Sequence, residues 1–327
     1  MTEIILQFLL SALAIIFAAR WIDHACDEIA KWSGLGHFFV GSLFLAASTS
    51  APEFFVDLKA TARGLPNLAA GDLLGSSLIN LIILASLTLI YRFKKSEGVP
   101  RSALFLSLLA ALLTFEVGLY ILFPSPGSFA GLHWGSYLLI LTYFVGVRFA
   151  FKPVLSDSAS QEPPKISRRK NLPFKSISRF ALAALVLFFA SSLLISSVET
   201  IALQTGLGST FIGTTLLALT TSFPELVTSI IAIRMGAFNL MVGNIVGSNA
   251  FNMLIFVFMD LIWRKGSLWD QLSKLHLLTA AIVILNMVIF SLTWYSQRKG
   301  NAILRFVGTI AILMVSLIGF FMLYRFR

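Results

Sequence analysis

Apolar residues gather in ten runs of about twenty residues along this chain, separated by short polar joints. A membrane-spanning helix needs about 20 consecutive apolar residues, so each run can cross a bilayer. The pattern therefore predicts an all-α integral membrane protein with ten transmembrane helices. The predicted spans lie near residues 4–22, 37–62, 67–91, 102–123, 132–151, 178–203, 209–234, 239–263, 274–295 and 302–324. The first run lacks a basic leader and continues past signal-peptide length, which favours a first span over a cleaved segment.

The longest polar stretch, residues 153–177, divides the spans into five and five. We therefore predict an N-terminal five-helix unit over 1–152, a cytoplasmic linker over 153–177 and a C-terminal five-helix unit over 178–327. The linker region holds the largest basic block, KISRRKNLPFKSISR, and Lys and Arg collect in cytoplasmic loops. This orientation places the N-terminus outside, and an even number of spans returns the C-terminus to the same side.

The two halves share sequence at a constant offset of 172. Residues 34–80 align without a gap on residues 206–252, with 19 identities in 47 positions. Five spans, an odd number, precede the second copy, so it must cross the membrane in the opposite sense. This arrangement is an inverted-topology repeat, which is common among secondary transporters.

Composition agrees with a chain whose main solvent is lipid. Hydrophobic residues make up 57% of it and charged residues 12%, with a mean hydropathy of +0.87. The net charge of +10 comes from Lys and Arg at the ends of apolar runs, and no basic face is interleaved with aromatic residues, which excludes a nucleic-acid partner. The single cysteine, Cys26, excludes an internal disulfide and a thiolate metal cluster.

Each copy carries a T-S-x-P-E segment that places a glutamate, Glu53 or Glu225, inside a predicted span. A carboxylate at the bilayer centre costs about 2.5–3.5 kcal/mol on insertion scales, so it normally faces a cavity or a partner. The preceding proline has no N–H to donate and clashes with the preceding turn, which predicts a break in the helix. Non-helical backbone at this depth is tolerated where it lines a cavity.

The break is expected to expose carbonyls near Ala46 and Ala218 and to leave hydroxyl groups beside the carboxylates. These hydroxyls belong to Thr49, Ser50, Thr221 and Ser222. Oxygen-only ligands suit Na⁺ or Ca²⁺ and disfavour zinc or copper. The four histidines, His24, His37, His133 and His276, fall near predicted helix ends, where we expect interfacial or loop roles.

The next span of each copy carries the pattern G-x-x-x-G-S-x-x-x-N. Its members are Gly71, Gly75, Ser76 and Asn80 in the first copy, and Gly243, Gly247, Ser248 and Asn252 in the second. The glycines are interpreted as packing positions that let helices approach closely, whereas the Ser and Asn oxygens could complete a cation cage. Two glutamates balance one Ca²⁺, and the neutral oxygens could host several Na⁺. Burial disfavours the charged form of a carboxyl group, so protons are candidate counter-ions.

Four further acids lie in or near the spans. Asp57, one turn beyond Glu53, has Ser229 as its counterpart; it could line an ion vestibule or pair with Lys59 or Arg63, and we favour pairing. The others, Glu116, Glu199 and Asp260, have no motif around them and are interpreted as structural.

An enzyme is the first alternative from another class. The chain has no G-x-S-x-G, H-E-x-x-H or paired catalytic aspartates, so we predict neither an enzyme nor a cofactor beyond the transported ions. A passive channel could also use buried glutamates, and single-channel currents would distinguish it from an exchanger.

The segments S-T-S-A-P-E with G-D-L-L-G-S-S-L-I-N, and T-T-S-F-P-E with G-N-I-V-G-S-N-A-F-N, resemble the two inverted α-repeats of the calcium/cation antiporter superfamily, the sodium/calcium exchanger group. The resemblance implies ten helices, alternating access and Na⁺/Ca²⁺ antiport, with H⁺/Ca²⁺ exchange as the alternative. We expect a multi-pass protein of the prokaryotic inner membrane that acts as a monomer.

The same resemblance implies a set of ion ligands. Carried over by position, the calcium ligands are Glu53, Glu225, Thr49 and Thr221, and the sodium ligands are Ala46, Ser50, Ser76, Asn80, Ala218, Ser222, Ser248 and Asn252. The chain departs from the family pattern where Ser48 and Thr220 replace glycine, and where Asp72 and Ser77 replace asparagine.

Overall fold

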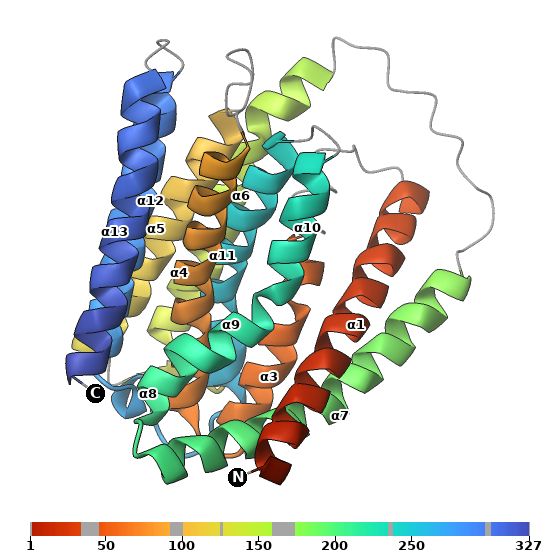
Figure 1. The fold of residues 1–327 in the computed structure, drawn as a ribbon, viewed down its shortest axis with the longest axis vertical. Helices are drawn as coiled ribbons and strands as arrows, with labels where there is room; N and C mark the ends of the chain where they lie inside the picture. The colour runs from red at the N-terminus through yellow and green to blue at the C-terminus, as the bar shows by residue number, and fades with distance from the viewer. Residues whose placement is uncertain are drawn as a thin grey trace.

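A computed structural model describes residues 2–33, 46–91, 101–124, 127–158, 174–234, 238–297 and 302–326, nearly all of them helical (Figure 1). The first half contains α1 Thr2–Ser33, α3 Ala51–Ala62, α4 Pro66–Ile90, α5 Arg101–Leu122 and α6 Trp134–Ser158, with a hairpin of β1 Ser128–Phe129 and β2 Leu132–His133. The second half contains α7 Phe174–Thr205, α8 Ser209–Ile212, the π-helix η1 Gly213–Leu217, α9 Ala218–Thr221, α10 Phe223–Arg234, α11 Phe238–Ile262, the 3-10 helix η2 Trp269–Gln271, α12 His276–Gln297 and α13 Ala302–Phe326.

Most of the predicted spans correspond to apolar helices. Among the described residues, seven helices are long and apolar enough to cross a membrane, and the bent pair Ser209–Thr221 with Phe223–Arg234 raises this to eight. The predicted span 132–151 contains a shorter apolar helix, Trp134–Ala150. The predicted span 37–62 lies partly outside the described residues, so the total of ten stays a prediction. The protein is a helical membrane protein, with α1 beginning and α13 ending at the same end of the bundle (Figure 1).

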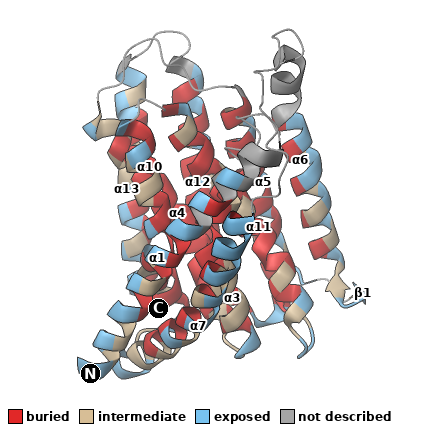
Figure 2. Ribbon diagram, turned by 90° about the vertical axis from the view of Figure 1, so that its right-hand side faces the viewer, coloured by how far each residue is buried: buried red, intermediate tan, exposed pale blue. Residues whose placement is uncertain are grey.

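Helices α4 and α11 form the centre of the bundle. In the most apolar 18-residue stretch of each helix, 72% of the residues are buried, against 28% in α1 and 33% in α13 (Figure 2). The outer helices carry exposed large apolar side chains, such as Leu10, Phe189 and Phe321. Exposed apolar surface of this extent is typical of a face that meets lipid.

Helices α1 and α7 lie side by side at one edge of the bundle, away from α12 and α13 (Figure 1). Near the end of α1, the Ser176 hydroxyl of α7 donates a hydrogen bond to Glu28, and Arg179 lies 3.6 Å from the same carboxylate. The hydrogen bond from Ser176 is the main reason that the pKa of Glu28 lies below its ordinary value. The pair contacts the rest of the bundle mainly through α3.

Asp260 fastens the β1–β2 hairpin to the end of α11, so its interpretation as structural is confirmed. Its carboxylate accepts hydrogen bonds from the His133 N–H at 2.8 Å and the Ser136 hydroxyl at 2.6 Å, and lies 2.9 Å from the His133 Nδ1. Glu116 likewise accepts a bond from Thr142. His276 begins α12 as predicted, but it is fully buried rather than interfacial.

We predict that Asp260→Ala destabilises the detergent-solubilised protein by roughly 2 kcal/mol or more, because it leaves buried donors without acceptors. Asp270, an exposed acid in η2, provides the control. Thermal unfolding should show a clear loss in Asp260→Ala and no change in Asp270→Ala. Equal stability of the two variants would contradict the structural role.

Candidate cation site

The two T-S-x-P-E segments interrupt helices in the same way, as predicted. A turn at Ser50 separates the helical residues 46–49 from α3, which has Pro52 in its first turn. A turn at Ser222 separates α9 from α10. The helical segment Ser209–Thr221, which contains α8, η1 and α9, meets α10 at a bend of 42°. Each glutamate therefore lies in the first turn of a short helix that starts inside the bundle.

The carbonyls of Ala46 and Ala218 do not lose their backbone partners, so that expectation was wrong. They accept the N–H groups of Ser50 and Ser222, both at 3.0 Å. The reason is that a proline deletes only the bond to the residue four positions before it, which for Pro224 is residue 220 and not 218. Each alanine carbonyl also lies 3.3 Å from the hydroxyl oxygen of a threonine, Thr49 or Thr221.

The two threonines each bind the central helix of the opposite half. Thr221 donates to the Asp72 carboxylate at 2.9 Å and lies 3.1 Å from the Ser76 hydroxyl. Thr49 donates to the Asn244 amide oxygen at 3.2 Å and lies 3.1 Å from the Ser248 hydroxyl. The two sets of partners differ by 172 at every position, so the contacts are pseudo-symmetric.

Glu53 and Glu225 are both fully buried and lie near each other. The Ser50 hydroxyl donates to Glu225 Oε1 at 3.3 Å, which links the two halves again. Neither oxygen of Glu53 accepts a hydrogen bond of normal geometry among the described residues, and its polar neighbours are its own N–H, the Ser76 hydroxyl, Glu225 and Asp72. A buried carboxylate with so few donors is the arrangement that a bound cation would complete.

The amides of the central helices meet between α4 and α11. Asn80 Nδ2 donates to Asn249 Oδ1 at 2.9 Å, and Asn249 Nδ2 donates to the Ser77 carbonyl at 3.0 Å. The Asn80 Oδ1 atom and both polar atoms of Asn252 are buried without a partner among the described residues. Asn249 orients Asn80, a role that no residue pattern in the sequence indicated, although Asn249 is the counterpart of Ser77 at the offset of 172.

Asp57 does not pair with a nearby base, so the favoured interpretation was wrong. Lys59 places its Nζ 4.0 Å from the centre of the Phe188 ring, and Arg63 donates to Ser196 at 2.8 Å. Residues two positions apart point to different faces of a helix, which explains why Lys59 cannot reach Asp57. Asp57 is fully buried, and no hydroxyl, amide or backbone donor among the described residues reaches its carboxyl oxygens; its main polar neighbour is the Asp72 carboxyl group.

The glycines of α4 allow backbones to approach closely, as the packing interpretation predicted. A Cβ on Gly71 would lie 2.8 Å from the Thr210 carbonyl oxygen, and one on Gly75 would lie 2.5 Å from that of Thr214. A Cβ on Gly213 would lie 2.4 Å from the Leu68 carbonyl oxygen. Close packing of α4 against α8 and η1 thus brings Thr221 within reach of α4.

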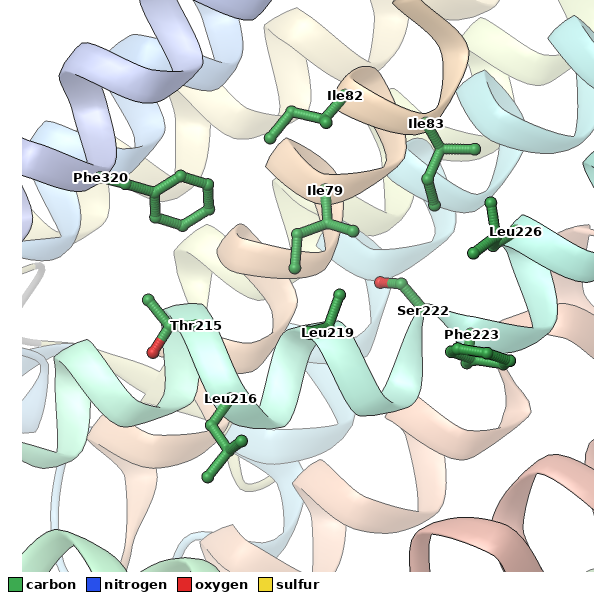
Figure 3. Close-up of a pocket in the computed structure, with 10 residues that line it drawn as sticks. All are labelled: Ile79, Ile82, Ile83, Thr215, Leu216, Leu219, Ser222, Phe223, Leu226 and Phe320. Carbon is green, nitrogen blue, oxygen red and sulfur yellow. The ribbon is translucent and has the colours of Figure 1, made fainter. Parts of the chain in front are cut away.

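Ser222 lies between the cluster and an apolar cavity. Its hydroxyl has no hydrogen-bond partner among the described residues and lies at the wall of a cavity of about 550 Å³ between α4, the η1–α10 segment and α13 (Figure 3). The other lining residues are Ile79, Ile82, Ile83, Thr215, Leu216, Leu219, Phe223, Leu226 and Phe320.

All twelve predicted site residues lie in the described part of the chain, and all are buried. The set is Ala46, Thr49, Ser50, Glu53, Ser76, Asn80, Ala218, Thr221, Ser222, Glu225, Ser248 and Asn252. Hydrogen bonds join most of them directly or through Asp72, Asn244 and Asn249. Within the described ranges, no group of three or more His, Cys, Asp or Glu side chains could hold a metal ion, so a cation here would also need hydroxyl, amide or carbonyl oxygens.

The sequence of this chain matches a known protein family over nearly its whole length. The model of the sodium/calcium exchanger protein family matches residues 3–152 and 175–327. The inner membrane protein YrbG of Escherichia coli is 25% identical over 305 residues, which cover 89% of each chain. The sodium/calcium exchanger MaX1 of Methanosarcina acetivorans is 23% identical, covering 95% of this chain and 99% of its own.

Two solved structures have the same fold over nearly the whole chain. The sodium-calcium exchanger NCX_Mj gives a TM-score of 0.62 at 19% identity, covering 97% of this chain and 98% of its own. The H⁺/Ca²⁺ exchanger CAX gives a TM-score of 0.65 at 14% identity, covering 98% and 88%.

Proposed function

The chain belongs to the sodium/calcium exchanger family, and on that premise we propose that it is a secondary active antiporter that exchanges Ca²⁺ for Na⁺ by alternating access. The observation that carries the proposal is the buried pair of Glu53 and Glu225, each in the first turn of an interrupted helix, with the Ser50 hydroxyl of the first half bonded to Glu225 of the second. A charge of −2 in a mostly neutral oxygen cage suits one Ca²⁺ or a small number of Na⁺ ions.

We also propose that the chain is built from two inverted five-helix repeats, over 1–152 and 178–327, joined by a cytoplasmic linker. The supporting observation is that three helix pairs have bounds that differ by 172 at both ends: α1 and α7, α3 and α10, and α4 and α11. Helices α5 and α12 also share a length of 22 residues, and α6 and α13 a length of 25. In this arrangement the N-terminus lies outside and a single chain forms a complete transporter.

Within the proposed site, Glu53, Glu225, Thr49 and Thr221 bind Ca²⁺. The sodium ligands are Ala46, Ser50, Ser76 and Asn80 with their counterparts Ala218, Ser222, Ser248 and Asn252. The two sets overlap in space because the threonine hydroxyls contact Ser76 and Ser248. Overlap makes occupation by the two ions mutually exclusive, which is the requirement for exchange.

The test is ⁴⁵Ca²⁺ flux in proteoliposomes that contain the purified protein. We expect an imposed Na⁺ gradient to drive calcium uptake. An imposed pH gradient that stores the same free energy should drive little calcium uptake. H⁺/Ca²⁺ exchange is the second candidate, because the H⁺/Ca²⁺ exchanger CAX has the same fold. Calcium flux that ignores Na⁺ and follows pH would replace the first proposal by the second, and single-channel currents without counter-transport would reject both.

The amides provide a graded test of the same site. Asn80→Ala and Asn252→Ala remove neutral oxygens that have no partner among the described residues. We expect each change to raise the sodium concentration for half-maximal flux by about fivefold to tenfold, since a neutral ligand is worth roughly 1 kcal/mol. Both variants should keep measurable exchange. Unchanged sodium dependence in both would remove these amides from the site.

A further inference from the structure

Two more acids lie next to Glu53. Asp57 and Asp72 are fully buried, and none of the ion pairs among the described residues involves either of them. With Glu53 and Glu225 they bring the buried formal charge of this region to −4 when all are ionised. One Ca²⁺ balances only half of it, and uncompensated buried charge is strongly unfavourable.

The two aspartates occupy a level of their own between the glutamates and the α3–α4 turn. Asp57 lies one helical turn beyond Glu53 on α3, and Asp72 lies one turn before Ser76 on α4. One helical turn advances the backbone by about 5–6 Å. Asp57 and Asp72 are therefore closer than Glu53 and Ser76 to residues 63–65, which connect α3 to α4. The two carboxyl groups are near enough to each other to share a hydrogen bond when one of them carries a proton.

Few donors reach the oxygen atoms of these two carboxyl groups. No hydroxyl, amide or backbone donor among the described residues reaches either oxygen of Asp57 or the Oδ2 atom of Asp72, so the two carboxyl groups have mainly each other as polar partners. Independently, the Thr61 hydroxyl, one turn beyond Asp57 on the same face of α3, is 1% exposed and has no partner. A threonine in a helix can donate to the carbonyl four residues before it, as Thr88 does to Leu84. Thr61 makes no such bond, so it keeps a free oxygen on the face of α3 that carries Asp57.

We propose that Asp57 and Asp72, assisted by Thr61, form a second site for a divalent cation of the Ca²⁺ type, beside the Glu53–Glu225 site and nearer the α3–α4 turn. Two carboxylates and a hydroxyl are hard oxygen ligands, and their charge matches one divalent ion. This inference rests on the proposed function, because the transport pathway is what brings cations to this depth. Asp72 connects the two sites, since its Oδ1 atom accepts the hydrogen bond of Thr221.

The second site exists on one side only. The counterparts of Asp57, Asp72 and Thr61 at the offset of 172 are Ser229, Asn244 and Ile233, which carry no charge. A cation that approaches from the α3–α4 side therefore meets an acidic site before it reaches the glutamates, whereas one from the opposite side does not. The proposal thus makes a symmetric scaffold functionally asymmetric.

The test is calcium binding to the full-length protein in detergent, measured by isothermal titration with CaCl₂. The main variant is Asp57→Ser with Asp72→Asn, which installs the residues that the second half carries at these positions, so the fold already tolerates them. We expect two bound Ca²⁺ per chain in the wild type, one in this variant, and one in the variant Glu53→Gln with Glu225→Gln. Glu116→Gln, a buried acid bonded to Thr142 outside the cluster, should bind like the wild type.

The proposal is overturned if Asp57→Ser with Asp72→Asn binds as many ions as the wild type with the same affinity, or if the glutamate variant binds none. A pair that takes up only protons gives the latter result. Failure of the proposed function is a separate observation, because it would appear as absent Na⁺-driven flux in proteoliposomes whatever the binding stoichiometry. Size-exclusion chromatography of each variant verifies that it is folded.

Discussion

Replacing either Glu53 or Glu225 by glutamine is expected to abolish sodium-driven calcium exchange. Both carboxylates are fully buried, and they come from opposite halves of the chain. Glutamine keeps the shape of the side chain but removes one of the two charges that balance Ca²⁺. Removing one partner from a buried charged pair typically costs about 3–5 kcal/mol. Since each 1.4 kcal/mol is tenfold in affinity, calcium binding should weaken by roughly 100-fold or more.

The measurement is initial ⁴⁵Ca²⁺ uptake into proteoliposomes under a fixed Na⁺ gradient, with each variant reconstituted at equal density. Glu116→Gln is the matched control, because it makes the same chemical change at a buried acid of α5 that binds Thr142. It should transport at close to the wild-type rate. Normal flux in Glu53→Gln or Glu225→Gln would refute the assigned site, and an inactive Glu116→Gln would make the test uninformative about charge at the glutamates.

The sequence could predict the interruptions at the two T-S-x-P-E segments because their causes are local. A proline cannot continue the hydrogen-bond ladder, and a buried glutamate needs a polar environment, so residue types alone fix where the helices break. The turns at Ser50 and Ser222 lie where these rules place them. The internal repeat supplied the long-range information, because the equal spacing in both copies requires equivalent surroundings for Glu53 and Glu225.

The partners of individual side chains could not be predicted in the same way. Asp57 was assigned to Lys59 or Arg63 because those bases are near in sequence, but helical phase turns Lys59 toward Phe188 and Arg63 toward Ser196. The contacts of Thr221 with Asp72 and of Asn80 with Asn249 join residues more than 140 positions apart. Such pairs depend on how α4 and α11 pack against the interrupted helices, which no local rule contains.

These cross-connections explain how ion occupancy could be communicated between the halves. Thr49 and Thr221 stand at the ends of helical segments that lead into the breaks, and each is bonded to the central helix of the other half. A cation that recruits a threonine oxygen competes with these hydrogen bonds. If the proposed site is correct, binding at the glutamates would change the contacts that hold both interrupted helices, which is the kind of differential contact that shifts a two-state equilibrium.

Gly75→Ala and Gly213→Ala are expected to destabilise the protein and eliminate transport together. Alanine is favoured over glycine inside a helix by about 1 kcal/mol, so the intrinsic effect alone is stabilising. At these two positions the added Cβ would lie 2.5 Å from the Thr214 carbonyl oxygen or 2.4 Å from that of Leu68. Both obstacles are backbone atoms that cannot rotate away, and overpacking typically costs about 1–3 kcal/mol, so destabilisation wins.

The functional consequence follows from the position of the contact. Gly75 and Gly213 set the separation between α4 and η1, and η1 leads through α9 to Thr221, whose hydroxyl reaches Asp72 at 2.9 Å and Ser76 at 3.1 Å. A shift of a few tenths of an ångström to relieve the clash would move Thr221 away from both. The fraction that still folds should therefore show weakened calcium binding as well as a lower midpoint of thermal unfolding.

Gly118→Ala separates this packing effect from the loss of a helical glycine. Gly118 lies inside α5, and the nearest atom to an added Cβ there would be the Leu277 Cδ2 at 3.8 Å, an ordinary van der Waals distance. We expect this variant to be as stable as the wild type or more so, and to retain exchange. If Gly75→Ala and Gly213→Ala unfold at the same temperature as Gly118→Ala, then α4 and η1 do not need their close approach, and the glycines of the motif must serve another purpose.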